Sequence, residues 1–262
     1  MSADLPAGLR KVLPPDTARS WVVLREILPH SMILYDGTAI AAHLSHRTSR
    51  DLDFFFDDPD VDLASLREAL TTLRPTAVTD QAAHTLNAVF GQTKVQFLSM
   101  AGQVPVDRDT KIAGLRVASL RDLAATKIKV IGDRGELRDY FDLMVIEQRT
   151  PVTVETALVD YQARYNDSRN LAHLVRALGY LGDVADDPAL PTARDQIERY
   201  WATRQPATLA SFDQTGRIPR PAPEEPLPAP SPRPESGDAG GMVWVEPHLR
   251  NGRQVRGHYR RR

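Results

Sequence analysis

The chain of 262 residues contains no cysteine, few aromatic residues (6%) and a formal net charge of only −1. Without cysteine, disulfides, thiolate metal ligands and cysteine nucleophiles are excluded. No stretch approaches the roughly 18 uninterrupted apolar residues that a membrane helix needs, and the first residues lack the charged-then-apolar pattern of a signal peptide. We therefore expect a globular cytoplasmic protein that makes no use of a membrane.

Composition divides the chain into three zones. Residues 1–213 alternate apolar and polar runs at the spacing of regular structure. Residues 214–241 are rich in proline, glycine, serine and acids, so we expect a disordered linker that cannot bury enough apolar surface to fold. Residues 242–262 form a basic tail, with six arginines and one acid from Trp244 onward. Arginine and aromatic rings bind phosphates and bases, so RNA contact and a solvated tail both remain open.

Within the first zone the pattern changes near residue 118. Before it, strands and helices mix, with helices expected at 20–28, 38–44 and 61–73 and strands at 32–35, 52–56 and within 76–100. After it, Ser119 resembles a helix N-cap, and only helices follow, at 119–131, 136–147, 153–164, 171–181 and 193–202. We therefore expect an α/β lobe over 1–118 and a helical lobe over 119–213, with a cleft between them.

Two aspartates carry the most informative chemistry. Asp51 and Asp53 are two residues apart in or beside a predicted strand, so their side chains share one face, about 7 Å apart. Two carboxylates so placed repel each other, and a divalent cation would remove that penalty. Oxygen ligands beside phosphate favour Mg²⁺ or Mn²⁺. Asp-x-Asp alone is a weak motif, and its neighbours must strengthen it.

Gly37 and Thr38 lie at a predicted strand-to-helix turn. Glycine lets backbone approach a ligand closely, and a helix N-terminus presents free N–H groups to an anion. A triphosphate would suit this turn, with the metal bridging it to the aspartates. Ser49 precedes Asp51 on the same face and is a candidate to support metal or phosphate. Arg47 either contacts phosphate or braces the loop.

This stretch resembles the first motif of the nucleotidyltransferase AbiEii/AbiGii toxin family, written Gly-Gly-Thr-Ala-Leu…Gly-His-Arg-x-Ser-x-Asp-Leu-Asp-Phe-Phe. The chain keeps these residues of it: Gly37, Thr38, Ala39, His46, Arg47, Ser49, Asp51, Leu52, Asp53, Phe54 and Phe55. Asp36 replaces the first glycine and Ser45 the later one. Neither change removes a metal ligand, but Asp36 adds negative charge near the proposed phosphate site.

A second stretch resembles the family's Lys…Arg…Arg/Lys-Asp-x-x-Asp-Leu pattern. By this resemblance Lys127 contacts the triphosphate, and Arg134, two helical turns later, shares its face if the helix persists. Asp142 is expected to face the cleft. Arg138 and Asp139 are equally well explained as members of an internal ion-pair cluster.

The resemblance implies an α+β fold with a polymerase β-like mixed sheet in the N-terminal lobe and a helical C-terminal lobe. It also implies magnesium-dependent transfer of a nucleotide from an NTP to an acceptor hydroxyl, most simply a tRNA 3′ end. By the same kinship the chain would be the toxin of a toxin–antitoxin pair. The basic tail would then contact RNA or bind the antitoxin.

One departure concerns the third carboxylate that enzymes of this fold commonly carry on a neighbouring strand. Here Gln96 or Ser99 stands where that acid is expected, and neither accepts a proton at neutral pH. The general base is then Asp53, Asp142 or water. Two alternatives stay open, namely a protein or small-molecule acceptor, and a relative without catalysis that binds an NTP or a protein partner.

Overall fold

The computed structural model describes residues 5–167 and 171–212, with the backbone of four short strands beyond them. The chain divides into two compact units, 1–220 and 221–262. The linker expected at 214–241 lies outside the described residues. In the second unit, β8 (Met242–Val245) pairs with β11 (His258–Arg261), and β9 (His248–Arg250) pairs with β10 (Arg253–Val255), so strands form within the predicted basic tail.

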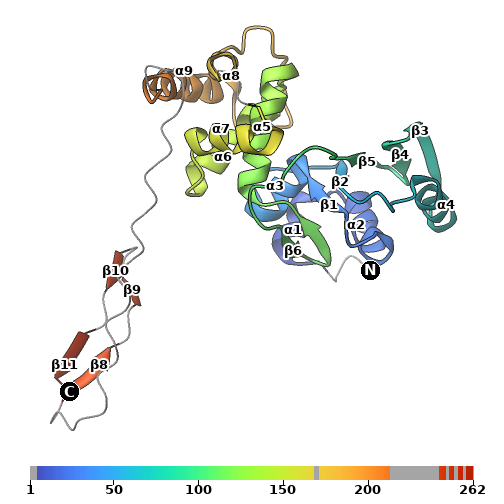
Figure 1. The fold of residues 1–262 in the computed structure, drawn as a ribbon, viewed down its shortest axis with the longest axis horizontal. Helices are drawn as coiled ribbons and strands as arrows, with labels where there is room; N and C mark the ends of the chain where they lie inside the picture. Colours follow the sequence, from blue (N-terminus) through green and yellow to red (C-terminus); the bar gives the residue numbers. More distant parts are fainter. Residues whose placement is uncertain are drawn as a thin grey trace. The chain divides into compact units, whose positions relative to one another are not determined.

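The first unit is built on a mixed seven-stranded sheet in the order β3-β4-β5-β2-β1-β7-β6 (Figure 1). Its strands are β1 (Ile33–Tyr35), β2 (Leu52–Phe56), β3 (Thr76–Ala82), β4 (Thr85–Phe90), β5 (Thr93–Ser99), β6 (Thr110–Ile112) and β7 (Leu115–Val117). β2 runs parallel to β5 and β1 parallel to β7, whereas the other neighbours are antiparallel. The strand that carries Asp53 therefore lies in the middle of the sheet.

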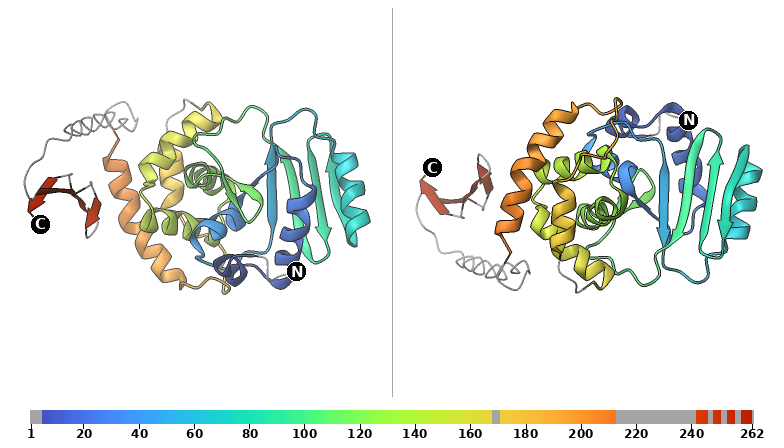
Figure 2. Two further views of the ribbon diagram at one scale, coloured as in Figure 1. Left: turned by 90° about the horizontal axis from the view of Figure 1, so that it is seen from below. Right: turned by 90° about the horizontal axis from the view of Figure 1, so that it is seen from above.

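Nine helices are described in this unit. They are α1 (Ala7–Val12), α2 (Pro15–Ile27), α3 (Asp36–Leu44), α4 (Leu63–Leu73), α5 (Leu120–Arg134), α6 (Leu137–Arg149), α7 (Val154–Tyr165), α8 (Ala172–Leu178) and α9 (Arg194–Ala210). Helices α5–α9 gather on one side, whereas β3–β5 and α4 lie at the opposite end (Figure 2). None of the helices in the described part of the chain is long and apolar enough to cross a bilayer.

Alternation of apolar residues explains why β2 occupies this central position. Leu52, Phe54 and Phe56 are buried, whereas the intervening Asp53 and Phe55 are only half-buried. Phe54 stacks on Phe97 of β5, at a centroid distance of 5.5 Å, and both side chains are buried in the core. One face of the strand thus joins the core, and the other presents Asp53.

Helix α3 contacts both the sheet and the later helices. It follows β1 directly and packs on both α5 and α6, with Gly37–Ala41 buried along its first turns. Residues near its N-terminus therefore meet the sheet on one side and the later helices on the other. This is the position in which the sequence-based site was expected.

The predicted fold class is confirmed: a mixed sheet comes first and helices follow. Strand β2 has the predicted bounds, and Ser119 caps α5 by accepting a hydrogen bond from the Asp122 N–H at 3.0 Å. The short elements α1, β6 and β7 were not predicted, because three to six residues carry too little periodicity. The lobe boundary at residue 118 stays a prediction, although β7, the last strand of the sheet in the sequence, ends at Val117.

Candidate active site

Asp51 and Asp53 line a cavity of about 550 Å³. Asp51 lies just before β2 and Asp53 within it, and both line the cavity, as their spacing predicts. The cavity wall continues through Gly37 and Arg47 to residues 187–190, which follow α8. The sheet, the start of α3 and the helical region thus all contribute to one site.

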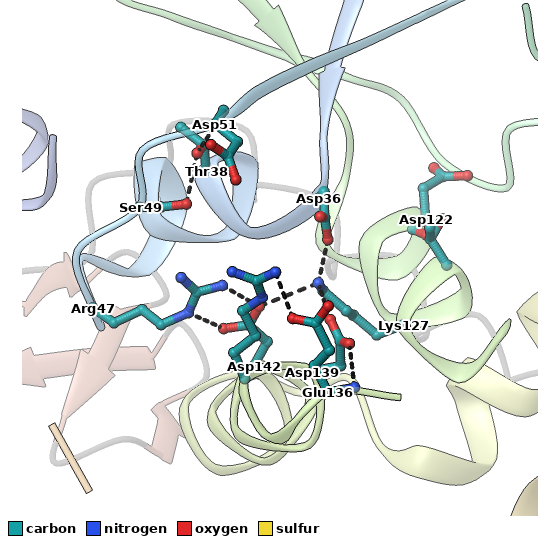
Figure 3. Close-up of polar contacts among 12 residues, drawn as sticks. Asp36, Thr38, Arg47, Ser49, Asp51, Asp122, Lys127, Glu136, Asp139 and Asp142 are labelled. Atoms are coloured by element: carbon teal, nitrogen blue, oxygen red, sulfur yellow. Dashed lines mark hydrogen bonds and ion pairs between the residues drawn. The ribbon is translucent and has the colours of Figure 1, made fainter. Parts of the chain in front are cut away.

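Thr38 and Ser49 position the loop that ends at Asp51. The Thr38 hydroxyl donates a hydrogen bond to the Asp51 carbonyl at 2.5 Å and lies 2.7 Å from Ser49 Oγ (Figure 3). Both side chains are buried, with 1% and 8% of their surface exposed. Thr17 binds the Arg50 carbonyl at 3.0 Å from the other side. The contacts shown therefore give Thr38 and Ser49 a positioning role, and only Ser49 also lines the cavity.

Asp53 is held in an environment that opposes its negative charge. Burial, followed by the nearby charges of Asp36 and Asp51, raises its pKa from 3.8 to about 8. Lys127 and Arg138 lower it, but by less. A carboxylate in this position lacks compensating positive charge. A divalent cation between Asp51 and Asp53 would supply it.

Lys127 is the centre of a buried ion cluster. Its ammonium group is 2.7 Å from Asp139 and 3.3 Å from Asp142, and it also donates to Asp36 (Figure 3). Only 1% of the side chain is exposed. Burial lowers the pKa of Lys127, but the three carboxylates outweigh burial and raise it. The amine is a fixed cation, and it does not line the cavity that was expected to hold the triphosphate.

Asp142 was expected to face the cleft, but it is fully buried. Arg47 donates to its two oxygens at 2.6 and 2.7 Å, and His46 Nε2 lies 2.7 Å from one of them. Burial raises the pKa of Asp142, but Lys127, Arg47 and His46 together hold it below its usual range. Asp142 thus ties the loop before β2 to helix α6, and its geometry does not suit a general base.

Arg47 braces the loop in the way that one of the two sequence interpretations expected. Its guanidinium passes so close to Gly37 that a Cβ atom there would lie 2.3 Å from Nη2. Since two hydrogen bonds to Asp142 fix this guanidinium, a side chain at residue 37 would displace it. Gly37 therefore makes room for Arg47 as well as lining the cavity.

Asp36 has a structural explanation that the sequence did not supply. Its φ is +57°, in the left-handed region that favours glycine. This agrees with the glycine of the family pattern at this position. Aspartate tolerates that conformation better than most residues, and its carboxylate pairs with Lys127. The extra charge is thus balanced on one side and faces the cavity on the other.

Arg134 and Arg138 have separate positions. The helix persists from Lys127 to Arg134, as α5, but Arg134 lines a second cavity of about 350 Å³ with Tyr140 and Tyr180. The structure does not bring it to the aspartates. Arg138 does line the main cavity and pairs with Glu136 at 2.5 Å.

Two cations in the main cavity were not singled out from the sequence. Arg50 and Lys94 line it, both are exposed, and neither forms an ion pair within the described part of the chain. Both cations lie close in the sequence to residues that were singled out, and this position could have identified them. Arg50 adjoins Asp51, and Lys94 lies two residues before Gln96 and so on the same strand face.

The strand register fixes the position of the missing third acid. Gln96 on β5 is the direct partner of Asp53 on β2, whereas Ser99 pairs with Phe56 at the strand end. Gln96 is therefore the residue beside the aspartate pair. Because an amide does not accept a proton at neutral pH, the general base must be another group.

The described residues contain no group of three or more acidic or histidine side chains arranged to hold a metal. Asp51 and Asp53 supply two oxygen donors on one wall, and waters and phosphate oxygens commonly complete the shell of Mg²⁺. Burial, followed by the charges of Asp36 and Asp51, raises the pKa of Asp53, and a bound cation would oppose both effects. The donor chemistry fits Mg²⁺ or Mn²⁺ held jointly with a phosphate-bearing substrate.

Comparison with known proteins gives a family match over most of the chain. The model described as "Nucleotidyl transferase AbiEii toxin, Type IV TA system" matches residues 23–110 and 99–218. An uncharacterised protein of Aquifex aeolicus is 24% identical over 170 residues, which cover 64% of this chain and 80% of that protein.

Two solved structures are similar, and the first of them supports the fold. A protein of H. pylori assigned as a nucleotidyltransferase superposes with a TM-score of 0.51 at 16% identity, covering 74% of this chain and 95% of that one. MenT4, a nucleotidyltransferase toxin from Mycobacterium tuberculosis, gives a TM-score of 0.49 at 15% identity over 80% and 88% of the two chains. On the family match, the chain belongs to the AbiEii nucleotidyltransferase toxin family and is a nucleotidyltransferase.

Proposed function

We propose that the protein transfers a nucleoside monophosphate from an NTP to the 3′ end of an RNA, with tRNA as the acceptor, in a reaction that requires Mg²⁺ or Mn²⁺. The observation that carries this proposal is one cavity that joins a carboxylate pair to cations without an ion-pair partner among the described residues. Asp51 and Asp53 would hold the metal, whereas Arg50 and Lys94 stand free to meet phosphate oxygens.

The cations divide into two groups with different roles. Lys127 and Arg47 are committed to buried carboxylates, so they fix the loop and helices that form the site. Arg50 and Lys94 are exposed and form no ion pair with the residues that the structure describes. We therefore assign triphosphate contact to the latter pair, and assign Lys127 to positioning Asp36.

The reaction is an in-line displacement. The acceptor hydroxyl oxygen bonds to the α-phosphorus while the bond from that phosphorus to the bridging oxygen breaks, and pyrophosphate leaves. A bound divalent cation supplies charge neutralisation at the phosphate oxygens. The protein contributes mainly position and electrostatics, as is usual for phosphoryl chemistry.

Water receives the hydroxyl proton in this proposal. Asp142 is buried with a lowered pKa, and Gln96 cannot accept a proton at neutral pH. Asp53 would be engaged as a metal ligand. Of the three bases considered from the sequence, solvent is the one that remains free.

Family membership and the basic tail support RNA as the acceptor. Six arginines lie beyond residue 243, in a unit separate from the catalytic one. Such a segment attracts a polyanion. We also propose that the protein acts in the cytoplasm as a toxin neutralised by a cognate antitoxin, because the family description names a toxin–antitoxin system.

The test is to incubate the full chain with total tRNA, Mg²⁺ and each α-labelled NTP in turn, beside Asp53→Asn. Label in tRNA that is lost in the variant supports the proposal. Label found only in the protein itself, or in an added aminoglycoside, would instead establish a different acceptor. NTP binding without label in any acceptor would indicate a relative that binds but does not catalyse.

A further inference from the structure

A third cavity, of about 410 Å³, shares Asp51, Asp53 and Lys94 with the main cavity at the aspartates. Its remaining polar side chains are uncharged, chiefly Asn87 and Gln96. We call this cavity the amide pocket. The aspartate pair and Lys94 thus lie where the main cavity, which has further cations, meets a cavity whose other polar side chains are uncharged.

The sheet register places the two amides in line with Asp53. Asp53 on β2 pairs with Gln96 on β5, and Gln96 pairs with Asn87 on β4. Neighbouring strands lie about 5 Å apart, so the row extends roughly 10 Å sideways from the aspartate. That distance suits one nucleoside lying across the strands.

Neither amide side chain is engaged by the part of the chain that the structure describes. The side chains of Asn87 and Gln96 have no hydrogen-bond partner among the residues that the structure describes, and Asn87 Oδ1 is buried without one. A buried polar atom without a partner is costly, and in native proteins it calls for an explanation. A ligand that hydrogen-bonds to the amide row would provide it.

The chemistry of the two cavities separates the two substrates. Phosphate oxygens need cations or N–H donors, which the first cavity offers through Arg50 and Lys94. Amides both donate and accept, so they match the hydroxyls of a ribose and the edge of a base. Gln96, which stands in place of the third acid, would then orient the acceptor rather than deprotonate it.

We propose that the amide pocket binds the terminal nucleoside of the RNA acceptor, with Asn87 and Gln96 hydrogen-bonding to its ribose diol. This rests on the proposed function, of which it specifies the acceptor subsite. It places the attacking hydroxyl beside Asp53 and the triphosphate on the Arg50 side.

The test compares the wild-type chain with Asn87→Ala and Gln96→Ala. The probe is a 5′-fluorescein RNA hexamer that ends either in a free 2′,3′-diol or in a 2′,3′-dideoxy nucleotide, with binding followed by fluorescence anisotropy. We expect wild type to prefer the diol by about tenfold, and each variant to lose most of that preference. Gln92→Ala is the matched control, since Gln92 lines only the first cavity.

Steady-state transfer separates this inference from the function itself. In both amide variants, KM for RNA should rise about tenfold while KM for NTP stays within about twofold of wild type. A rise in KM for NTP alone would assign the pocket to the nucleotide, and equal binding of both RNA ends by wild type would also overturn the inference. Diol preference that depends on Asn87, in a protein without turnover, would sustain the pocket and refute the proposed activity.

Discussion

Replacing Asp53 with asparagine should stabilise the metal-free protein at neutral pH and have a smaller effect in acid. The folded state raises the pKa of this carboxyl from 3.8 to about 8, chiefly through burial and then through Asp36 and Asp51. Between these values the folded protein binds more protons than the unfolded chain does. Stability is therefore lost as the pH rises through this window, whereas a neutral amide is insensitive to it.

The slope of the unfolding free energy against pH sets the size of the effect. One pH unit in this window changes the free energy of unfolding by at most about 1.4 kcal/mol. From pH 5 to pH 7 the stability of Asp53→Asn relative to wild type should thus rise by up to about 2.7 kcal/mol. Urea unfolding in EDTA at several pH values measures this difference directly.

Metal provides the control for this prediction. Added Mg²⁺ should restore stability to wild type at pH 8, and it should do much less for Asp53→Asn. A difference between the two proteins that stays constant from pH 5 to pH 8 would refute the charge argument. It would show that the folded state does not raise the pKa of Asp53, which is one reason for expecting a cation at this site.

Other predictions test the surrounding charges. Lys127→Met leaves buried carboxylates unpaired and should lower the free energy of unfolding by about 3–5 kcal/mol. Lys129→Met on the same helix breaks an exposed pair and should cost less than about 1 kcal/mol. Equal losses in urea unfolding would contradict the stabilising role of the buried ion cluster. Arg50→Ala should raise KM for NTP about tenfold without changing Tm, and an unchanged KM would remove it from the triphosphate site. Mn²⁺ affinity, measured by electron paramagnetic resonance, should rise with pH up to about 8, because the proton on Asp53 competes with the metal; a flat profile would oppose this. Deleting residues 216–262 should raise KM for RNA but not for NTP, and no change would make the tail dispensable for the acceptor.

Local rules were enough to predict the centre of the site. The two-residue repeat of a strand set both aspartates toward the cavity, and alternation with Leu52 and Phe54 gave β2 its bounds. The resemblance left Gln96 and Ser99 as alternatives for the position of the third acid, and the parallel pairing of β2 with β5 sets Gln96 beside Asp53. The strand alternation depends on neighbours within a few residues, so a sequence reveals it, whereas the choice between Gln96 and Ser99 needed the register of the assembled sheet.

The partners of Lys127 could not be predicted in this way. Asp36 lies 91 residues away, and the contact exists only because α3 packs against α5 and α6. A lysine within a motif fits phosphate contact and a buried ion cluster equally well. Burial decides between them, and burial is a property of the assembled fold. For the same reason Asp142 could not be recognised as the anchor of Arg47.

The central claim is that the cavity at Asp51 and Asp53 transfers a nucleotide and not a single phosphate. The most direct measurement supplies the full chain with tRNA, Mg²⁺ and an NTP labelled on either the α- or the γ-phosphate. We expect α-label to enter RNA, γ-label to be recovered as pyrophosphate, and Asp51→Asn and Asp53→Asn to abolish both. Transfer of γ-label to RNA, or α-label transfer that persists in both variants, would contradict it.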